Sequence, residues 1–462
     1  MSTETISKAA GAAPQSLRTS QERLNAVLGK KGEALSPRAL RKLLEQLQAI
    51  IDPRIGEVEG GRRAQAFIGW YEKAEPGERL DAWLLMSEQF LADQTKTQAA
   101  QAKYIAAIGT PDEAAAEVRL RRATVSPRRR ILQRISVLPT GVRFLVDMRA
   151  QLLPHLRAHP TLAALDVEME YMFSTWFDVG FLELRRMSWD SPASLLEKLI
   201  KYEAVHDIRS WADLKNRLDS DRRCYGFFHP RLPDEPLIFV EVALLGEMSA
   251  SITPLLDESA AAADLAKATT AIFYSISNTQ TGLRGVSFGD SLIKHVVDTL
   301  KEEFPRLKVF ATLSPIPGLR AWLGKNAARL LEGTSARHQQ SLARVLGEEP
   351  PTAKGILTAL DDVAAVKEDS PLGRWLLSCA AEYLGYGIEG SRPLDPVARF
   401  HLGNGARVER LNWLGDPSAK GLKQSFGLMV NYLYDLNRLD KHRTLLAQGK
   451  VPISGQIKSL RD

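Results

Sequence analysis

The chain has 462 residues, of which 44% are hydrophobic and 25% charged, as is typical of a globular protein with two or three domains. The sequence contains no apolar run long enough for a membrane-spanning helix, and its two cysteines exclude a disulfide framework. The modest net charge of +6 fits an anionic small ligand as well as nucleic acid. Because the densest basic run lacks interleaved aromatic residues, we expect neither a nucleic-acid nor a membrane partner.

The first 165 residues divide into two segments of different composition. Residues 1–35 are rich in Ala, Ser, Thr and charge, which predicts a disordered N-terminus. From 36 to 165 the apolar residues recur at helical spacing, which predicts an all-α helical bundle. One such stripe comprises Leu40, Leu43, Leu44, Leu47 and Ile50. A helical connector with many apolar residues is expected over 176–200.

Strand composition begins near Cys224. Short β-branched and aromatic runs bounded by Pro or Gly predict strands at 224–228, 237–245, 270–277, 308–313 and 406–414. Apolar residues at helical spacing over 292–300 predict an amphipathic helix between the third and fourth strands. The segment from about 319 to 395 is helical in pattern, which predicts a helical insertion inside an α/β domain.

A glycine-bearing turn lies between the strand at 270–277 and this helix. It comprises Arg284, Gly285, Val286, Ser287, Phe288 and Gly289. Unpaired N–H groups and the positive end of the helix dipole favour an anion at such a turn. These six residues are therefore candidates for binding a phosphorylated ligand, although a turn of this kind alone is a weak signal.

Two further segments carry candidate chemistry. Ser314 follows the buried strand at 308–313 and is followed by Pro315 and Pro317. The prolines end the strand, so we expect the serine side chain on a rigid turn at the end of the sheet. His401 is followed by Gly403, Asn404 and Gly405, which predicts that it lies on a second loop close to a ligand.

Four blocks in this order, at 222–228, 274–280, 314–318 and 400–406, resemble the malonyl-CoA decarboxylase family. The resemblance implies that Ser314 and His401 are the catalytic residues. It implies a GNAT-like α/β domain with a central mixed sheet over 166–462, preceded by a helical oligomerisation domain over 36–165. Leu319 replaces the usual Phe after the Ser-Pro-Ile-Pro-Gly motif, which is a conservative departure.

The glycine-bearing turn is similar to the turn with which GNAT acetyltransferases hold the coenzyme A diphosphate. Here Ser287 occupies the first glycine position of that pattern. Some members of the decarboxylase family carry a glutamate at this point, so no role for such a carboxylate can be transferred. Asn404, Asn412, Trp413, Asn431 and Tyr432 also match family blocks, and we hold Asn404 and Tyr432 as candidates for the substrate pocket.

The implied reaction converts malonyl-CoA to acetyl-CoA and CO2 through a thioester enolate. The thioester is already an electron sink, so no cofactor is expected beyond the coenzyme A of the substrate. Ser314 and His401 would stabilise the enolate and protonate it. The resemblance further implies self-association as a homodimer or homotetramer and a place in fatty acid metabolism. No convincing transit peptide or peroxisomal signal is present, so we expect a cytoplasmic location.

Three alternatives remain open from the residues alone. A GNAT-type acyltransferase would use the same coenzyme A turn but would need a base at an acceptor channel. A hydrolase would use Ser314 as a nucleophile, although no Gly-x-Ser-x-Gly elbow surrounds it. A scaffold built on the helical half would need neither residue.

Overall fold

The computed structural model describes residues 34–286 and 292–461, and its contacts divide the chain into two compact units. The helical unit comprises residues up to Thr175 together with Thr281–Val286. The sheet unit comprises Trp176–Gln280 and the residues from Ser287 onward. The predicted disorder of residues 1–35 lies outside the described residues, except at its last two positions.

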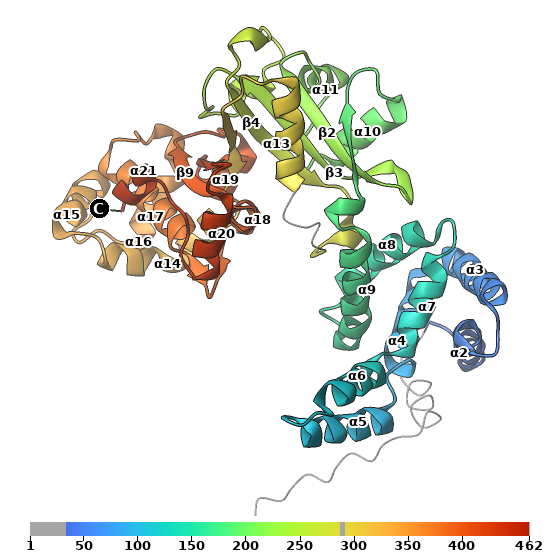
Figure 1. The fold of residues 1–462 in the computed structure, drawn as a ribbon. Coiled ribbons are helices and arrows are strands. Elements are labelled where there is room, and N and C mark those ends of the chain that lie inside the picture. The colour runs from blue at the N-terminus through green and yellow to red at the C-terminus, as the bar shows by residue number, and fades with distance from the viewer. Residues whose placement is uncertain (1–33, 287–291, 462) are drawn as a thin grey trace, which may run out of the picture. The chain divides into compact units, whose positions relative to one another are not determined.

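The predicted all-α character of the first part is confirmed (Figure 1). Ser36 caps the first described helix by accepting a hydrogen bond from Ala39 N at 3.3 Å, and the predicted leucine stripe of this helix is buried. The helices are α2 (Pro37–Ile51), α3 (Glu57–Lys73), α4 (Pro76–Gln89), α5 (Gln94–Ala107), α6 (Glu113–Thr124), α7 (Pro127–Ser136), α8 (Gly141–Leu152) and α9 (Ala163–Trp176). Within the described residues, no helix has both the length and the apolarity needed to cross a membrane.

A distant segment completes the helical unit. After the third long strand of the sheet unit, the chain forms the short 3-10 helix η5 (Thr281–Leu283), which contacts α8. The contact is close because Gly282 has no side chain: a Cβ there would lie 1.9 Å from the carbonyl oxygen of Val146. A short piece of the later sequence is therefore held by the early helices.

An eight-stranded mixed sheet forms the core of the sheet unit. Its order is β1-β2-β3-β4-β5-β10-β6, and β9 pairs with β10. Of the strand pairs described in this sheet, only β4 and β5 run parallel. The strands are β1 (Glu183–Met187), β2 (Arg222–His229), β3 (Leu232–Leu245), β4 (Thr270–Asn278), β5 (Val309–Thr312), β6 (Ser314–Pro315), β9 (Arg407–Asn412) and β10 (Met429–Leu433).

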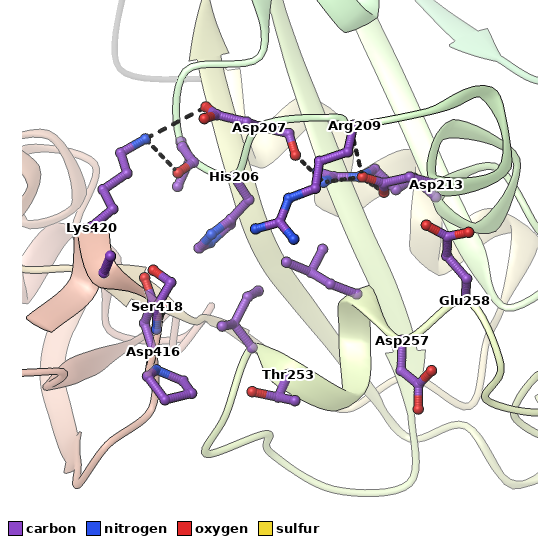
Figure 2. A pocket seen from close by; sticks show the side chains of 16 residues that line it. His206, Asp207, Arg209, Asp213, Thr253, Asp257, Glu258, Asp416, Ser418 and Lys420 are labelled. Atoms are coloured by element: carbon purple, nitrogen blue, oxygen red, sulfur yellow. Dashed lines mark hydrogen bonds and ion pairs between the residues drawn. The ribbon is translucent and has the colours of Figure 1, made fainter. Parts of the chain in front are cut away.

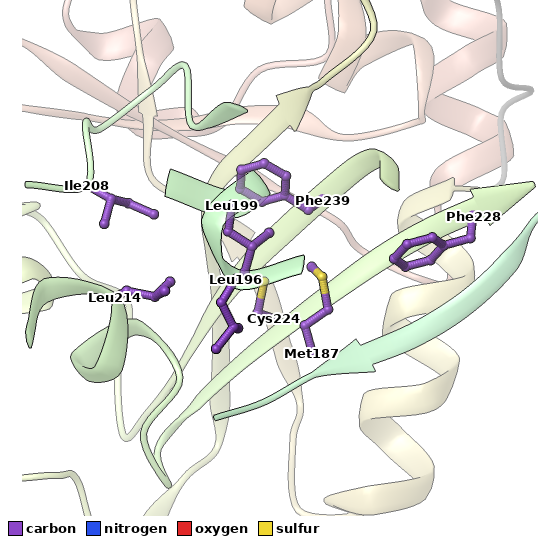
Figure 3. Close-up of a cluster of buried hydrophobic side chains, with 8 residues drawn as sticks. All are labelled: Met187, Leu196, Leu199, Ile208, Leu214, Cys224, Phe228 and Phe239. Atoms are coloured by element: carbon purple, nitrogen blue, oxygen red, sulfur yellow. The ribbon is translucent and has the colours of Figure 1, made fainter. Parts of the chain in front are cut away.

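Helices cover both faces of this sheet. On β2, Arg223 and Tyr225 reach Glu303 at the end of α13 (Leu292–Glu303), at 2.6 and 3.4 Å. Cys224 points to the other face, because side chains alternate along a strand. There it joins a buried apolar cluster with α10 (Ala193–Tyr202) and α11 (Trp211–Arg217). Figure 3 shows the cluster, which comprises Met187, Leu196, Leu199, Ile208, Leu214, Cys224, Phe228 and Phe239.

The predicted fold class is confirmed, and all five predicted strands are present with shifted ends. The parallel pair β4/β5 is joined through the crossover helix α13, as parallel pairing requires. One prediction was wrong: β1 lies inside the expected helical connector. Its residues pair antiparallel with β2, from Glu183 opposite Phe228 to Met187 opposite Cys224, so pairing at the sheet edge overrides their helical spacing.

Helices dominate between β6 and β9, as the sequence predicted. They are α14 (Leu319–Glu332), α15 (Ala336–Leu346), α16 (Ala353–Ala359), η6 (Leu360–Ala365), α17 (Pro371–Gly385) and α18 (Pro396–Gly403), with a small hairpin of β7 (Ile388–Glu389) and β8 (Arg392–Pro393) before α18. α19 (Ala419–Ser425) separates β9 from β10, and α20 (Leu439–Ala447) and α21 (Gly455–Ser459) follow. His401 lies in the last turn of α18, so the prediction that it lies on a loop was wrong.

Candidate active site

Ser314 sits where the paired strands change partners. β5 ends at Thr312, Leu313 N still donates to Phe273 O of β4 at 3.0 Å, and Ser314 then pairs with Val430 of β10. The Ser314 side chain is buried, with 4% of the residue exposed. Ser314 follows the end of β5, as predicted, but it belongs to the short strand β6 and does not lie on a turn, because its backbone pairs with β10.

Asp395 connects the helix that carries His401 to the turn that follows Ser314. One carboxylate oxygen of Asp395 caps α18 by accepting from Val397 N and Ala398 N at 2.9 and 3.0 Å. The other oxygen accepts from Gly318 N at 3.4 Å and from the Tyr383 hydroxyl at 3.3 Å. Burial raises the pKa of this carboxyl group. A single side chain thereby fixes the start of α18 relative to the proline-rich turn.

Ser314 and His401 are joined in a chain of hydrogen bonds. The Ser314 Oγ lies 3.2 Å from His401 Nε2 and donates to Thr312 Oγ1 at 2.8 Å. His401 Nδ1 lies 2.7 Å from the hydroxyl oxygen of Tyr434. Because the serine proton points to Thr312, Nε2 must carry the proton it shares with Ser314. Nδ1 therefore accepts from Tyr434, and the ring is the Nε2–H tautomer.

The His401 ring is buried and neutral. Burial lowers the pKa of His401 to about 3, because a low-dielectric environment disfavours the charged form. Its ring stacks on Tyr432, with centroids 4.7 Å apart and planes inclined by 26°. Burial also raises the pKa of both Tyr432 and Tyr434 well above the ordinary range. The site thus offers neutral hydrogen-bond donors and no fixed charge on these three side chains.

The two pocket candidates each have an unsatisfied polar atom near this chain of bonds. Tyr432 is fully buried, and among the described residues its hydroxyl has no hydrogen-bond partner. Asn404, at the C-terminal end of α18, donates from Nδ2 to Phe400 O at 2.8 Å, whereas its buried Oδ1 has no partner among those residues. Native proteins pair most buried polar atoms, so both atoms are suited to a ligand.

The side-chain amide of Asn431 is hydrogen-bonded within the fold through both its oxygen and its nitrogen, and that of Asn412 through its nitrogen. Asn431 Oδ1 accepts from Asn412 Nδ2 at 2.9 Å and from Arg410 Nε at 3.1 Å. Asn431 Nδ2 donates to the carbonyl oxygens of Thr312 and Ser249 at 2.7 and 3.1 Å. These bonds tie β10 to β5 and β9, which is a structural role.

The predicted phosphate-binding turn is described only in part. Arg284, Gly285 and Val286 belong to the helical unit, while Ser287, Phe288 and Gly289 lie outside the described residues. Arg284 is exposed. Gly285 has φ +83°, a left-handed conformation that glycine adopts without strain. The turn therefore needs this glycine for its backbone.

A separate cavity of about 610 Å³ lies in the sheet unit (Figure 2) and contains none of the predicted site residues. It is lined by parts of the segments 205–217, 252–258 and 416–420. Lys420 closes one side by donating to the carbonyls of Ala204 and Val205, each at 2.9 Å. His206 faces the same cavity, and burial lowers its pKa to about 4. In the ranges 34–286 and 292–461, no group of three or more His, Cys, Asp or Glu side chains is arranged to hold a metal ion.

Sequence reasoning missed Thr312, Asp395 and Tyr434. The signals were present: Asp395 followed by Pro396 is a typical helix start. Tyr434 is two residues beyond Tyr432, and so lies on the same face of β10 and its continuation. Thr312 is two residues before Ser314 and shares its face in the same way.

Comparison with known proteins identifies the family. The family model "Malonyl-CoA decarboxylase C-terminal domain" matches residues 180–461, and the corresponding N-terminal domain model matches residues 90–177. The mitochondrial malonyl-CoA decarboxylase of Anser anser anser is 38% identical over 393 residues, covering 81% of this chain and 78% of that protein. The mitochondrial enzyme of Mus musculus is 40% identical over 359 residues, covering 75% and 73%.

Two solved structures are similar over almost their whole length. The malonyl-CoA decarboxylase of Rhodopseudomonas palustris superimposes with a TM-score of 0.78 at 40% identity, covering 91% of this chain and 99% of that one. The malonyl-CoA decarboxylase of Agrobacterium vitis gives a TM-score of 0.80 at 40% identity, covering 91% and 100%. The chain therefore belongs to the malonyl-CoA decarboxylase family and is an enzyme of the carboxy-lyase class.

Proposed function

We propose that this chain converts malonyl-CoA to acetyl-CoA and CO2, with Ser314 and His401 acting on the reacting group. The observation that carries the proposal is the buried hydrogen bond between Ser314 Oγ and His401 Nε2, 3.2 Å long. Membership in the family supports the substrate, since both family models that match the chain and the similar proteins carry the name malonyl-CoA decarboxylase. The coenzyme A diphosphate is assigned to the turn from Arg284 to Gly289.

Loss of CO2 leaves negative charge on the thioester oxygen. The His401 Nε2–H and the Ser314 hydroxyl are neutral donors held 3.2 Å apart, and in this proposal they exchange their present bonds to Ser314 and Thr312 for bonds to the thioester oxygen; one such donor contributes about 10²–10³ in rate. A neutral imidazole is suited to this task because it donates a hydrogen bond without a charge that would stabilise the substrate carboxylate in its ground state. In this proposal the pair holds the malonyl group, and the unsatisfied atoms of Tyr432 and Asn404 line the same pocket.

The enolate carbon must finally receive a proton. A thioester enolate carbon is more basic than an imidazole anion, so we assign the proton to His401 Nε2. The imidazolate formed in this step takes a proton back from water, so the net reaction consumes one solvent proton and the ring returns to its neutral form. Tyr434 fixes the tautomer by donating to Nδ1, and its raised pKa makes it an orienting group rather than an acid. The Ser314 proton is directed to Thr312 rather than to His401, which disfavours the hydrolase alternative.

The first test incubates purified protein with malonyl-CoA, without added metal or acceptor, and follows the products by mass. Equal amounts of acetyl-CoA and CO2 support the decarboxylase. Free malonate and coenzyme A would instead identify a thioesterase. Coenzyme A binding without any product would redirect the assignment to a GNAT-type acyltransferase lacking its acceptor.

The second test replaces Ser314 and His401 one at a time. Ser314→Ala and His401→Asn should each lower kcat by about 10² or more without loss of folding. The matched control is His206→Asn, because His206 is also buried in the sheet unit but lines the other cavity. It should retain kcat within about twofold. Wild-type turnover in both site variants would remove Ser314 and His401 from the mechanism.

The proposal has further parts that need their own tests. It requires no cofactor beyond the substrate, and it places the enzyme in the cytoplasm and in fatty acid metabolism. Self-association as a homodimer or homotetramer is assigned to the helical unit, where large apolar side chains such as Val58, Ile105 and Val137 are 90%, 61% and 66% exposed. Analytical ultracentrifugation of the full chain would give the oligomer number, and a monomer would contradict this assignment.

A further inference from the structure

We propose that the cavity of the sheet unit shown in Figure 2 binds a small amino acid, with Asp416 and His206 holding its ammonium group and Arg209 its carboxylate. All three lining segments belong to the sheet unit, and no part of the malonyl-CoA reaction is assigned to them. The cavity volume of about 610 Å³ lies in the range of cavities that hold small molecules. The inference therefore goes beyond the proposed function and can be tested without it.

His206 is a buried residue whose ring has an unused nitrogen. The residue is 8% exposed, and its backbone N–H donates to Glu203 Oε1 at 2.8 Å. The ring lines the cavity, and among the described residues its Nε2 has no hydrogen-bond partner. Native proteins pair most buried polar atoms. This nitrogen is therefore suited to a ligand that enters the cavity.

Asp416 is a buried acid without a cation. It is 7% exposed, and its Oδ1 accepts from Ser418 N at 3.0 Å. Within the parts of the chain that the structure describes, no Lys, Arg or His side chain forms an ion pair with it. A buried carboxylate without a cation costs free energy. The ammonium group of a ligand would supply the missing charge.

The neutral state of His206 allows it to share that ammonium group. Burial lowers the pKa of His206 to about 4, although the charge of Asp416 acts in the opposite direction. The ring is therefore neutral at pH 7, and one of its nitrogens can accept a hydrogen bond. An ammonium group has three N–H donors, which are enough for both the carboxylate and the ring.

Arg209 supplies the complementary charge. Its backbone N–H donates to Asp213 Oδ2 at 3.0 Å, whereas its guanidinium forms no ion pair or hydrogen bond with residues 34–286 or 292–461. Figure 2 shows this exposed side chain and the His206 ring pointing into the same space. A guanidinium presents two parallel N–H donors that match a carboxylate. Arg209 is therefore suited to the carboxylate of the ligand.

The other cationic side chains that line the cavity already have acidic partners. The pairs are Arg217–Asp213 at 2.7 Å and Lys420–Asp207 at 3.8 Å. Two further acids of the lining, Asp257 and Glu258, are exposed to solvent. Asp416 would repel a simple anion, and Arg209 would repel a simple cation, whereas a zwitterion satisfies both.

Apolar side chains form part of the remaining wall. They are Val205, Ile252, Leu256, Pro417 and Ala419. Burying apolar ligand surface against them is favourable. We therefore expect the amino acid to have an aliphatic part.

The binding test is isothermal titration of the full chain with L-leucine and with its isomer 6-aminohexanoate, which carries the same two groups on distant carbon atoms. One of the two should bind at one site per chain with a Kd below about 1 mM. No binding of either up to about 10 mM would overturn the proposal. Because the titration needs no malonyl-CoA, its outcome is independent of whether the chain decarboxylates that substrate.

Analogues that lack one charged group test the zwitterion. For L-leucine these are 4-methylpentanoate, which lacks the amino group, and 3-methylbutylamine, which lacks the carboxylate; for 6-aminohexanoate they are hexanoate and pentylamine. Each should bind at least about tenfold more weakly than its parent. An analogue that binds as tightly as its parent would show that one of the two charges is not recognised, which contradicts the proposal.

Substitutions then test the residues. Arg209→Gln and Asp416→Asn should each raise Kd by about tenfold or more, and the asparagine keeps an oxygen that can accept from Ser418 N. The matched control is Asp257→Asn, which also removes a charge from the lining, although that carboxylate already accepts from Ser259 N and Oγ at 2.9 and 2.6 Å. Its Kd should stay within about twofold of wild type.

Two results would contradict the assignment of these residues. One is an unchanged Kd in Arg209→Gln, and the other is an equal rise in Asp257→Asn, which would indicate only a general effect of charge. If Asp416→Asn fails to fold, Arg209→Gln still decides, because the exposed Arg209 side chain has no partner among the described residues that its replacement would disturb.

Discussion

Arg149 in the helical unit and Arg217 in the sheet unit are both buried almost completely, and they have different roles. Arg149 and Arg217 are both 1% exposed, and each contacts two carboxylates. Arg217 bonds Asp213 at 2.7 Å and Glu241 at 3.1 Å, and both partners belong to the sheet unit, as Arg217 does. Arg149 also bonds two carbonyl oxygens of a segment that the chain supplies between β4 and α13.

The surroundings of the carboxylates explain the difference. Glu241 is 1% exposed, and burial raises its pKa to about 8 even beside Arg217. The side chain of Glu170, which pairs with Arg149, is 41% exposed. Arg217 thus offsets the burial of acids deep in the core, whereas Arg149 lies between the core and the backbone of a turn. Equal burial does not imply an equal role: Arg149 donates to two carbonyl oxygens of a segment more than 130 residues away, whereas Arg217 donates to one nearby carbonyl oxygen, that of Asp207, at 3.4 Å.

The largest expected effect is on the stability of the sheet unit. Arg217→Met should lower the free energy of unfolding by about 3–5 kcal/mol, because it removes the cation that the buried Asp213 and Glu241 share and leaves Asp213 with the Arg209 N–H donor. Urea denaturation of the full chain would measure this loss. The KM for malonyl-CoA should stay unchanged in the fraction of the protein that is folded. An Arg217→Met protein that unfolds at the wild-type urea concentration, or that has a raised KM, would contradict a purely structural role for Arg217.

The next largest effect is a loss of folding stability at acidic pH, which follows from the buried neutral ring of His401. The pKa of His401 is about 3 in the folded protein and about 6.5 in an unfolded chain. The unfolded state therefore binds the additional proton as the pH falls from about 6.5 to 3, and the folded state loses stability over that window. At pH 4 this single group contributes a loss of about 3 kcal/mol relative to pH 7.

His401→Gln should remove that contribution. Urea unfolding at pH 7 and pH 4 would show a smaller acid-induced loss in the variant than in wild type, by about 3 kcal/mol. His206→Gln, whose parent side chain has a pKa lowered to about 4, should remove a smaller part. Equal losses in wild type and in His401→Gln would mean that the ring is not buried in its neutral form.

The sequence predicted the parts of the fold that depend on local periodicity. The leucine stripe of α2 and the apolar face of α13 are buried as their spacing indicated. The sequence does not predict the short strand β1, because its five residues include only one apolar residue on each side of the charged pair Arg185 and Arg186. Its strand state comes from pairing with β2, which no local pattern encodes.

For the candidate site, too, the sequence predicted only the residues whose place depends on local pattern. Ser314 was located because prolines end a strand, a purely local effect. The contacts of Arg149 could not be predicted, since its carbonyl partners lie 133 and 135 residues away in the sequence. The chain of bonds from Thr312 through Ser314 and His401 to Tyr434 likewise joins β5, β6 and α18 to the residue that follows β10. Only the folded chain brings them together.

A smaller effect tests whether a positioning residue of the sheet unit acts on kcat rather than on KM. Tyr434→Phe removes the O–H donor to His401 Nδ1 and keeps the ring, which lies 6.3 Å from that of Phe273. Without that donor the His401 tautomer is no longer fixed, so kcat should fall about tenfold, and KM should change little. Steady-state kinetics would show it, and an unchanged kcat would remove Tyr434 from the mechanism.

The smallest effect is expected at Asp395, because one substitution can keep half of its bonds. Asp395→Asn retains an oxygen that can cap α18 through Val397 N and Ala398 N, but its amide cannot accept from Gly318 N. The free energy of unfolding should fall by less than about 1 kcal/mol, whereas Asp395→Ala, which also loses the cap, should cost about 1–2 kcal/mol more. Thermal denaturation of both variants separates the two contributions. Equal melting temperatures for Asn and Ala would mean that the cap contributes nothing, and that α18 holds His401 in place through its packing alone.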